Sequence, residues 1–209
     1  MFTTTLSDHA QTTLALLGKS GLVSKAYLAG GSALALYFGH RYSIDFDFFS
    51  SEKFDPQKLS HDLKQLGKFK TSVAKGISLI GEFNAVKLSY FEYNYPLIGP
   101  FAKFSDINIA SIDDIAAMKL VAIMDRGTKK DFIDLFEMIK QGRNLEDLFK
   151  LYDKKYKLLA ENIYSILRSL QYFDDAELSQ MPRMIRKVTW KEVKGLISAE
   201  TIRLAGKYL

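Results

Sequence analysis

The stretch LAGGSALALYFGHRYSIDFDFF, residues 28–49, indicates most about the fold of this 209-residue chain. Residues Ala26–Ala29 are short and apolar, as in a buried strand, and lead into the glycine turn Gly30-Gly31-Ser32. Ala33–Phe38 favours a helix, and Ile44–Phe49 alternates polar and apolar side chains as a strand does. The stretch therefore predicts a strand, a glycine turn, a helix and a second strand.

Two carboxylates occupy alternate positions on the second predicted strand. Because successive strand side chains point to opposite faces, Asp45 and Asp47 are expected on the same face. The opposite face is apolar, with Ile44, Phe46 and Phe48. Two like charges in such a setting are costly unless a cation neutralises them, and Mg²⁺ is the cation that carboxylates bind alongside substrate phosphates. A strand with one solvated face is the alternative interpretation.

The glycine turn adds a phosphate site to the same hypothesis. The backbone N–H groups of Gly31 and Ser32 are expected at the start of a helix, where they can receive a phosphate, with the Ser32 hydroxyl as a further donor. Taken alone, the three residues are also explained by a plain tight turn. Together with Asp45 and Asp47, they predict a phosphate cradle facing a metal site.

Charged residues farther along the chain form a second group. Lys119 is the only polar residue in the apolar run Ile115–Met124, so the stem of its side chain is expected to be buried. It is either a snorkelling lysine at the edge of the core or a cation for a triphosphate. Asp131 and Asp134 share one helix face. A bound phosphate or an ion-pair network would each explain the cations around the start of that helix, which are Arg126, Lys129 and Lys130.

The remaining pattern predicts an α+β fold. The expected elements are helices at Ser7–Lys19 and Asp55–Leu66, two or three strands over Phe69–Phe91 with turns at Gly76 and Gly81, a loop over Tyr93–Phe104 and a strand at Ile107–Ile109. Further helices are expected after Ser111 and at Lys130–Lys140, Leu145–Tyr156, Leu158–Leu170 and Trp190–Tyr208. We therefore expect a mixed-sheet domain at residues 1–110 packed on a helical domain at 111–209, with a shared cleft.

Composition and charge exclude several classes of site. The chain has no cysteine, which excludes thiol nucleophiles, thiolate zinc sites and disulfides. No N-terminal export signal is present, and no apolar run approaches the ~20 residues that a membrane span requires. This predicts a cytoplasmic protein without a membrane segment. The net charge of +5 arises in Met181–Leu209, where seven basic residues stand against two acidic ones.

Four motifs occur in order along the chain. They are Gly30-Gly31-Ser32, Asp45-Phe46-Asp47, DDIAAMK at 113–119 and KDFIDL at 130–135. In this combination the chain resembles the AbiEii/AbiGii toxin family of nucleotidyltransferases, which is related to the mycobacterial MenT toxins and belongs to the polymerase-β-like superfamily. The resemblance covers most of the chain.

The resemblance implies a function as well as a fold. It implies a Mg²⁺-dependent nucleotidyltransferase that moves an NMP from an NTP to an acceptor, tRNA or another RNA. Such an enzyme would be the toxin of a toxin–antitoxin or abortive-infection system, with a cognate antitoxin as its partner.

The resemblance also assigns roles to individual residues. Gly31 and Ser32 would hold the nucleotide phosphates, Lys119 matches the family lysine near the triphosphate, and Asp131 matches the essential acid of the K-D-x-x-D-L motif. The complete expected set is Asp45, Asp47, Lys119 and Asp131 as catalytic residues, Gly31, Ser32, Lys119, Arg126 and Lys130 as nucleotide-binding residues, and Asp45 and Asp47 as metal ligands.

One departure from the family pattern keeps two further interpretations open. The superfamily usually has a third carboxylate on a later strand, and the predicted strand Val86–Phe91 offers Lys87 and Ser89 there. One interpretation is a nucleotide-binding regulatory module with weak or no catalytic activity. The other is a structural α+β domain in which Asp45 and Asp47 form only a solvated strand face.

The basic C-terminal segment has two interpretations. Its predicted helix carries an apolar stripe that should pack on the helical bundle, formed by Trp190, Val193, Ile197, Leu204 and Tyr208. Lys187, Lys191 and Lys194 cluster beside the stripe. They form either a solvated face or, if the chain is a nucleotidyltransferase, a binding site for an RNA backbone.

Overall fold

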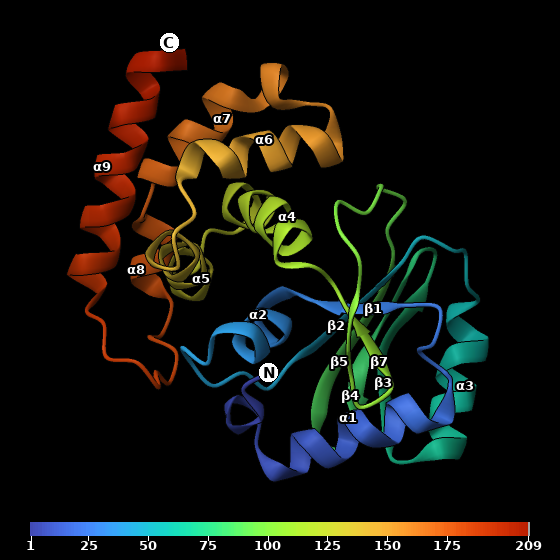
Figure 1. Cartoon of the computed structure of the whole chain (residues 1–209). Helices are drawn as coiled ribbons and strands as arrows, with labels where there is room; N and C mark the ends of the chain where they lie inside the picture. The colour runs from blue at the N-terminus through green and yellow to red at the C-terminus, as the bar shows by residue number, and fades with distance from the viewer. Residues whose placement is uncertain (209) are drawn as a thin grey trace. The chain divides into compact units, whose positions relative to one another are not determined.

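The computed structural model describes residues 1–208 and divides the chain into two compact units, Met1–Ser111 and Ile112–Leu209. Leu209, the last residue of the predicted helical domain, lies outside the described residues. Unit 1 contains a mixed sheet with helices, and unit 2 is helical (Figure 1), so the predicted α+β class is confirmed. Within residues 1–208, no helix is long and apolar enough to cross a membrane.

Unit 1 is built on a seven-stranded sheet in the order β3-β4-β5-β2-β1-β7-β6. The strands are β1 Tyr27–Ala29, β2 Phe46–Ser50, β3 Phe69–Lys75, β4 Ser78–Phe83, β5 Val86–Glu92, β6 Ala102–Phe104 and β7 Ile107–Ile109. β1 pairs antiparallel with β2 and parallel with β7, while β2 pairs parallel with β5. The sheet is therefore mixed, and β1 and β2 lie near its centre.

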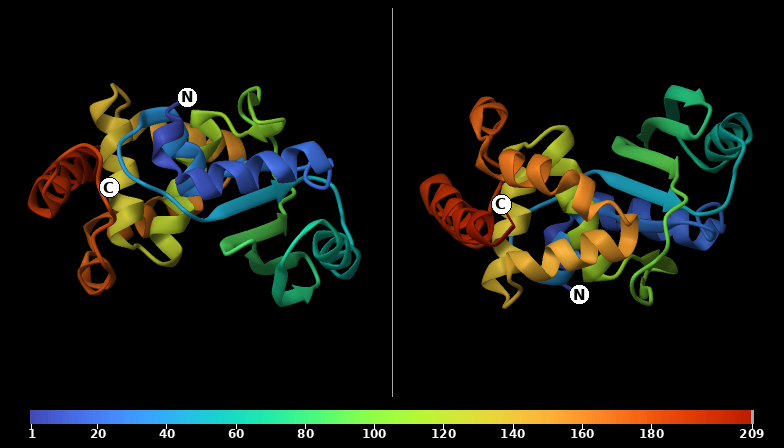
Figure 2. Two further views of the ribbon diagram at one scale, coloured as in Figure 1. Left: turned by 90° about the horizontal axis from the view of Figure 1, so that it is seen from below. Right: turned by 90° about the horizontal axis from the view of Figure 1, so that it is seen from above.

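Helices cover this sheet and close its core. They are the 3₁₀ turn η1 Thr3–Thr5, α1 Asp8–Ser20, α2 Gly30–Phe38 and α3 Pro56–Leu66. Ser7 begins α1 by accepting a hydrogen bond from the Ala10 N–H, and Asp55 caps α3 just before Pro56 at its first position. α1 contacts β7, α2 contacts β1 and β2, and α3 lies beside β3 and β4 (Figure 2).

The second predicted strand begins two residues later than expected, so the prediction that it starts at Ile44 is wrong. β2 covers Phe46–Ser50, and Ile44 is 64% exposed instead of sharing the buried face of Phe46. The segment before β2 is held outside the sheet because the Ser43 N–H donates to the Thr5 carbonyl at 3.0 Å. Asp45 therefore precedes the strand, and only Asp47 has a place in its register.

The strands β3, β4 and β5 form the expected meander, but the turn predicted at Gly81 is wrong. Gly81 lies inside β4, between Thr71 and Leu88 of the neighbouring strands. A side-chain carbon at this position would lie 2.6 Å from the Phe69 ring, so glycine leaves room for the ring. The turn lies instead at residues 84–85, which both have positive φ, as a tight hairpin requires.

The predicted loop over residues 93–104 is wrong at its end. Its last residues, Ala102–Phe104, form β6 and pair antiparallel with β7. The pairing is closed by Ser105 and Asp106, which have φ values of 49° and 61°. Pro96 and Pro100 favour a loop over this segment, so only the pairing with β7 identifies its last residues as a strand.

Unit 2 is a bundle of helices. They are α4 Ile112–Asp125, α5 Lys129–Lys140, α6 Leu145–Tyr156, α7 Leu159–Gln171, α8 Asp174–Leu178 and α9 Trp190–Tyr208. The short α8 had no counterpart among the predicted elements. α4 contacts α5, α6 and α7, and α9 contacts the same three helices (Figure 1).

The apolar stripe of α9 packs inward as predicted. Val193, Ile197 and Leu204 are fully buried. The Trp190 ring lies 5.9 Å from the Phe132 ring between centroids, an edge-on contact that anchors the start of α9 on α5.

A fully buried ion pair joins two helices of this bundle. The Lys155 ammonium on α6 donates to the Asp114 carboxylate on α4 at 2.7 Å, and neither side chain has exposed surface. A buried charge whose partner is removed is strongly destabilising. The pair therefore fixes α6 against α4.

Replacement of Lys155 by Met should lower the free energy of unfolding by about 3 to 5 kcal/mol, because the Asp114 carboxylate then stays buried without its ammonium. Urea titration followed by circular dichroism measures this change. Adding Asp114→Leu should recover most of the loss. Lys154→Met at the exposed neighbouring position is the matched control, and an equal effect of both single variants would contradict the role of the pair.

Candidate functional site

The start of α2 is an open helix N-terminus in unit 1. The preceding residue is Ala29, whose methyl side chain cannot cap the first N–H groups of the helix. Gly30 has a φ of +65°, a left-handed conformation that only glycine adopts readily. The N–H groups that follow, at Gly31 and Ser32, belong to the first turn, where helices bind anions.

The carboxylate of Asp47 lies directly beside this helix start. In the pairing of β1 with β2, Ala29 stands opposite Asp47. A side-chain carbon added at Gly30 would lie only 3.0 Å from Asp47 Oδ2. The glycine therefore serves two purposes, because it allows the turn and it lets the carboxylate approach the backbone.

The hydroxyl of Ser32 connects the turn to the segment that carries Asp45. Ser32 is buried, and its hydroxyl donates to the carbonyl oxygen of Asp45 and lies 2.9 Å from Ser43 Oγ. This bond holds the backbone of Asp45 against α2, even though Asp45 lies outside the strand. The structure thus brings Gly31, Ser32, the carboxylate of Asp47 and the backbone of Asp45 together within unit 1.

Arg41 also belongs to this region, although no motif in the sequence marks it. Its side chain is only 3% exposed, and its guanidinium occupies the space that a side chain at Gly31 would take. Nη1 of Arg41 donates to the Tyr42 carbonyl at 3.1 Å. The Arg41 side chain thereby packs against the glycine turn at Gly31. The only sign of it in the sequence is an arginine placed shortly before the two aspartates.

The sheet position beside Asp47 holds a serine. β2 and β5 pair in parallel with Asp47 opposite Ser89, so the two side chains share one face. This is the strand on which a third carboxylate was expected. Lys87 lies two residues away on the same face and is exposed.

Two carboxylates, not three, are therefore the acidic groups of this site. In the part of the chain that the structure describes, no group of three or more His, Asp or Glu side chains is arranged to hold a metal ion. The hard oxygens of Asp45 and Asp47 nevertheless fit Mg²⁺, which commonly binds one or two protein carboxylates together with substrate phosphates.

Aromatic side chains continue the face that carries Asp47. Phe49, two residues along β2, has ring centroids at 5.2 Å from Tyr93, 5.6 Å from Phe91 and 6.1 Å from Tyr27. No pattern in the sequence reveals this group, because its members come from separate segments of the chain. The rings therefore pack on one another and extend the apolar part of this face.

Unit 2 contains the second predicted group of residues. Lys119 on α4 is 4% exposed, and its ammonium donates to Asp131 Oδ1 at 3.1 Å and to Asp134 Oδ2 at 2.8 Å. The helical spacing of three placed both aspartates on one face, as predicted. The lysine stem is buried as expected, and its charge is held between two fully buried carboxylates.

Asp131 is the centre of this network. It accepts bonds from Arg126 Nε at 3.1 Å and from the Thr128 hydroxyl at 2.6 Å. Burial alone would raise the pKa of the Asp131 carboxyl, but the ammonium of Lys119 and the guanidinium of Arg126 lower this pKa well below its ordinary value. Asp131 is therefore ionised at neutral pH and holds the turn between α4 and α5.

Contacts within unit 2 engage the cations near the start of α5. Arg126 bonds Asp131, and the Lys129 ammonium donates to the carbonyl of Ser179 at 2.7 Å and lies 5.7 Å from the Trp190 ring. Of the two alternatives left open by the sequence, Arg126 shows the ion pair, whereas Lys129 is engaged by backbone carbonyls and by the Trp190 ring. Lys130 is half-buried on the first turn of α5.

The three lysines of the basic segment differ in their surroundings. Lys194 lies 2.5 Å from the Glu177 carboxylate and 5.7 Å from the Trp190 ring. Lys187 and Lys191 are exposed and have no ion-pair partner among residues 1–208. Lys187 and Lys191 are therefore the more accessible charges of the cluster.

Comparison with known proteins identifies relatives across nearly the whole chain. A family model described as nucleotidyl transferase AbiEii toxin, type IV toxin–antitoxin system, matches residues 13–86 and 77–198. The uncharacterized protein aq_aa25 of Aquifex aeolicus (strain VF5) is 44% identical over 161 residues, which cover 75% of this chain and 77% of that protein.

Solved structures share the fold at low sequence identity. JHP933 from Helicobacter pylori has a TM-score of 0.57 at 19% identity, over 97% of this chain and 94% of its own. The MenT4 nucleotidyltransferase toxin from Mycobacterium tuberculosis H37Rv has a TM-score of 0.55 at 14% identity, over 94% and 87% of the two chains.

The Asp131 network leads to a pH-dependent prediction. Asp131→Asn should lower the free energy of unfolding by about 3 kcal/mol at neutral pH, because it removes the buried charge that Lys119 and Arg126 share. The folded-state pKa is lowered, so this stabilisation is present above the unfolded pKa of about 4 and is lost as pH falls toward the folded value. Urea titrations at neutral and acidic pH should show the difference between the two proteins shrinking on acidification. Asp175→Asn, at an exposed position, is the control, and a pH-independent difference would contradict the assignment.

Proposed function

The chain belongs to the AbiEii family of nucleotidyltransferase toxins, and on this premise we propose that it transfers an NMP from an NTP to an RNA acceptor in a Mg²⁺-dependent reaction. The observation that carries the proposal is the contact between the open N-terminus of α2 and the Asp47 carboxylate. A phosphate-binding element and a carboxylate lie side by side there, as phosphoryl-group transfer requires.

We assign the metal to Asp45 and Asp47. Their carboxylate oxygens are the ligands that Mg²⁺ prefers, and the triphosphate would complete the coordination. When bound, the ion supplies neutralisation of the charge that develops on the phosphates and on the pyrophosphate leaving group. The chain's own contribution is to hold the Asp47 carboxylate beside the helix start through the β1–β2 pairing, and to hold the backbone of Asp45 there through the Ser32 bond.

The backbone N–H groups of Gly31 and Ser32 bind phosphate oxygens in this proposal. They are fixed before the substrate arrives, because Arg41 supports the turn and the Ser32 side chain is already bonded inside unit 1. Fixed donors lower the barrier without reorganisation during the reaction. The nucleotide-binding roles of Lys119, Arg126 and Lys130 and the catalytic role of Asp131 stay predictions that rest on the resemblance; we propose no contact with substrate for them.

The acceptor and the partner follow from the family. We propose an RNA acceptor, tRNA or another RNA, and a cognate antitoxin that controls the enzyme in the cytoplasm. The exposed lysines Lys187 and Lys191, with Lys194 beside them, supply positive charge for a phosphate backbone. Their contribution would be independent of RNA sequence.

The first test is transfer of label from each of the four NTPs to total tRNA in the presence of Mg²⁺. The Asp47→Ala variant should lose more than about 100-fold in rate and should also bind Mn²⁺ more weakly, as read by electron paramagnetic resonance. Asp175→Ala, at an exposed position on α8, should react like the unmodified protein. Absence of transfer with all four NTPs would reject the RNA-modifying activity.

One observation favours a second candidate function, a nucleotide-binding module with little or no turnover. Ser89 occupies the sheet position opposite Asp47 where a third carboxylate was expected. Calorimetry distinguishes the two functions, because metal-dependent NTP binding without any product would support the binding module. Formation of labelled RNA would reject it.

The basic segment gives a further prediction. Replacing Lys187, Lys191 and Lys194 together by Ala should weaken RNA binding and reduce its dependence on salt, since roughly one counterion is released for each phosphate contact. NTP affinity should stay unchanged. Fluorescence anisotropy with labelled tRNA and calorimetry with NTP measure the two quantities. If both affinities fell together, or if neither changed, the three lysines would form only a solvated face and no RNA-binding site.

A further inference from the structure

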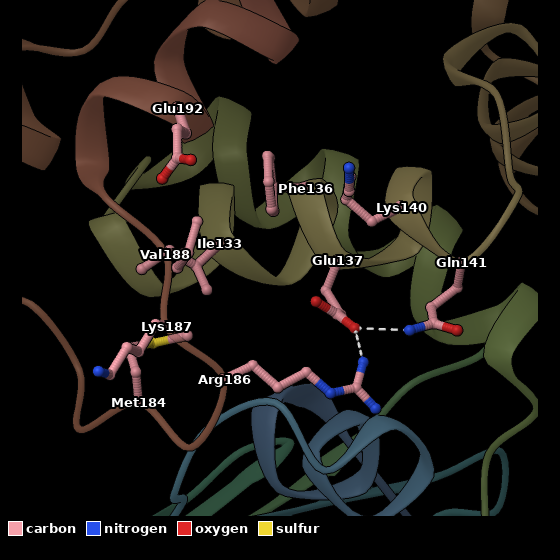
Figure 3. A pocket seen from close by; sticks show the side chains of 10 residues that line it. All are labelled: Ile133, Phe136, Glu137, Lys140, Gln141, Met184, Arg186, Lys187, Val188 and Glu192. Atoms are coloured by element: carbon pink, nitrogen blue, oxygen red, sulfur yellow. Dashed lines mark hydrogen bonds and ion pairs between the residues drawn. The ribbon is translucent and has the colours of Figure 1, made fainter.

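A pocket in unit 2 lies beside the basic segment and is unused by the function described so far. Its volume is about 380 Å³, within the range of small-ligand sites. It lies between α5 and the segment that leads into α9 (Figure 3). The lining side chains are Ile133, Phe136, Glu137, Lys140, Gln141, Met184, Arg186, Lys187, Val188 and Glu192.

The pocket has apolar walls, and its rim carries two ammonium groups, from Lys140 and Lys187, and the carboxylate of Glu192, whose Oε2 is bonded by Thr189 at the start of α9. Ile133, Phe136 and Val188 supply the apolar surface, including one partly exposed aromatic ring. The ammonium groups of Lys140 and Lys187 lie on opposite sides of it in Figure 3. A planar apolar group flanked by negative charges on both sides is the ligand that this arrangement fits.

A buried carboxylate presents one oxygen atom to the pocket in a fixed orientation. Glu137 is 7% exposed, and its Oε1 accepts bonds from Arg186 Nη1 and from Gln141 Nε2. Oε2 accepts no bond from the residues that the structure describes and points into the pocket (Figure 3). A carboxylate oxygen held in this way accepts a hydrogen bond from an amino group on the ligand.

We propose that this pocket binds one unpaired nucleobase of the acceptor RNA and selects bases that carry an exocyclic amine. The inference rests on the proposed RNA acceptor and adds base selection to it. The base packs against Phe136, its amine donates to Glu137 Oε2, and Lys140 and Lys187 contact the flanking phosphates. Adenine, cytosine and guanine have the amine, and uracil presents carbonyl oxygens instead.

The variant Glu137→Gln would replace the hydrogen-bond acceptor in the pocket by a donor. The amide oxygen of the new side chain would accept the bonds from Arg186 and Gln141, as Oε1 does now, so its NH₂ group would point into the pocket. The pocket would then offer a donor where it offered an acceptor. The variant keeps its internal bonds, and the base preference should shift toward uracil.

The experiment measures binding of labelled single-stranded oligo(A), oligo(C) and oligo(U) to the full-length protein by fluorescence anisotropy. The unmodified protein should bind oligo(A) and oligo(C) about tenfold more tightly than oligo(U), as expected for one charge-assisted hydrogen bond. Glu137→Gln should abolish or reverse this ratio. A purely structural role of Glu137 would weaken all three affinities alike and leave the ratio unchanged.

A blocking variant tests the pocket itself. Val188→Trp should fill it and weaken binding of oligo(A) and oligo(C) roughly tenfold, the loss of one stacked base. Ile185→Trp, on the same segment but outside the lining, is the matched control and should bind normally. Lys140→Ala should weaken all three homopolymers, and Lys154→Ala, an exposed lysine on α6, should not.

Equal affinities for the three homopolymers, an unchanged ratio in Glu137→Gln or normal binding by Val188→Trp would each overturn the inference. Normal binding by Val188→Trp would indicate that the Glu137 carboxylate binds a basic side chain of a protein partner instead. If tRNA is still labelled in the transfer assay, the proposed function survives that failure. If no RNA binds while an NMP is transferred to another acceptor, the proposed RNA acceptor and the proposed base pocket are both rejected. The proposed nucleotidyl transfer would still stand.

Discussion

The register between β1 and β2 is the constraint on which the candidate site depends. It places Ala29 opposite Asp47, and α2 begins at the next residue, Gly30. The backbone donors of the helix start and the carboxylate are consequently neighbours before any substrate binds. A slip of one residue would turn Asp47 to the buried face of Phe46 and Phe48 and remove the carboxylate from the helix start. The apolar alternation of β2 thus specifies the site as well as the core.

Unit 2 depends on a different constraint, the pairing of charges that are fully removed from water. Lys119 lies between Asp131 and Asp134, and Lys155 is paired with Asp114. Such pairs cost desolvation energy and are weak evidence for high stability. Each of them, however, accepts only one helix arrangement, because any other would leave a buried charge without a partner. Their effect is to specify how α4 meets α5 and α6, and the Asp131 carboxylate is held in place by that arrangement.

Local patterns predicted the elements that depend on neighbours in sequence, and failed where the decisive neighbour comes from elsewhere in the chain. The glycine turn and most of the helices were visible in the sequence. Gly81 looked like a turn because nothing local reveals the Phe69 ring across the hairpin. The alternation that includes Asp45 continues beyond the paired part of β2, since pairing, and not alternation, ends a strand. The place of Arg41 against the glycine turn and the position of Lys119 between two carboxylates are tertiary contacts that no helical or strand period contains.

Unit 2 would recognise RNA in two different ways, one through charge and one through the geometry of a hydrogen bond. Exposed ammonium groups such as Lys187 and Lys191 attract any phosphate backbone and give affinity that falls with salt. A carboxylate such as Glu137 repels that backbone, and its ion pair with Arg186 engages only Oε1. Because Oε1 is occupied by Arg186 and Gln141, its free oxygen has a fixed direction and can accept only from a donor at one place. The affinity supplied by Lys187 and Lys191 would therefore be separable from the base selection supplied by Glu137. Phosphate contacts and base contacts are separable in the same way in nucleic-acid recognition generally.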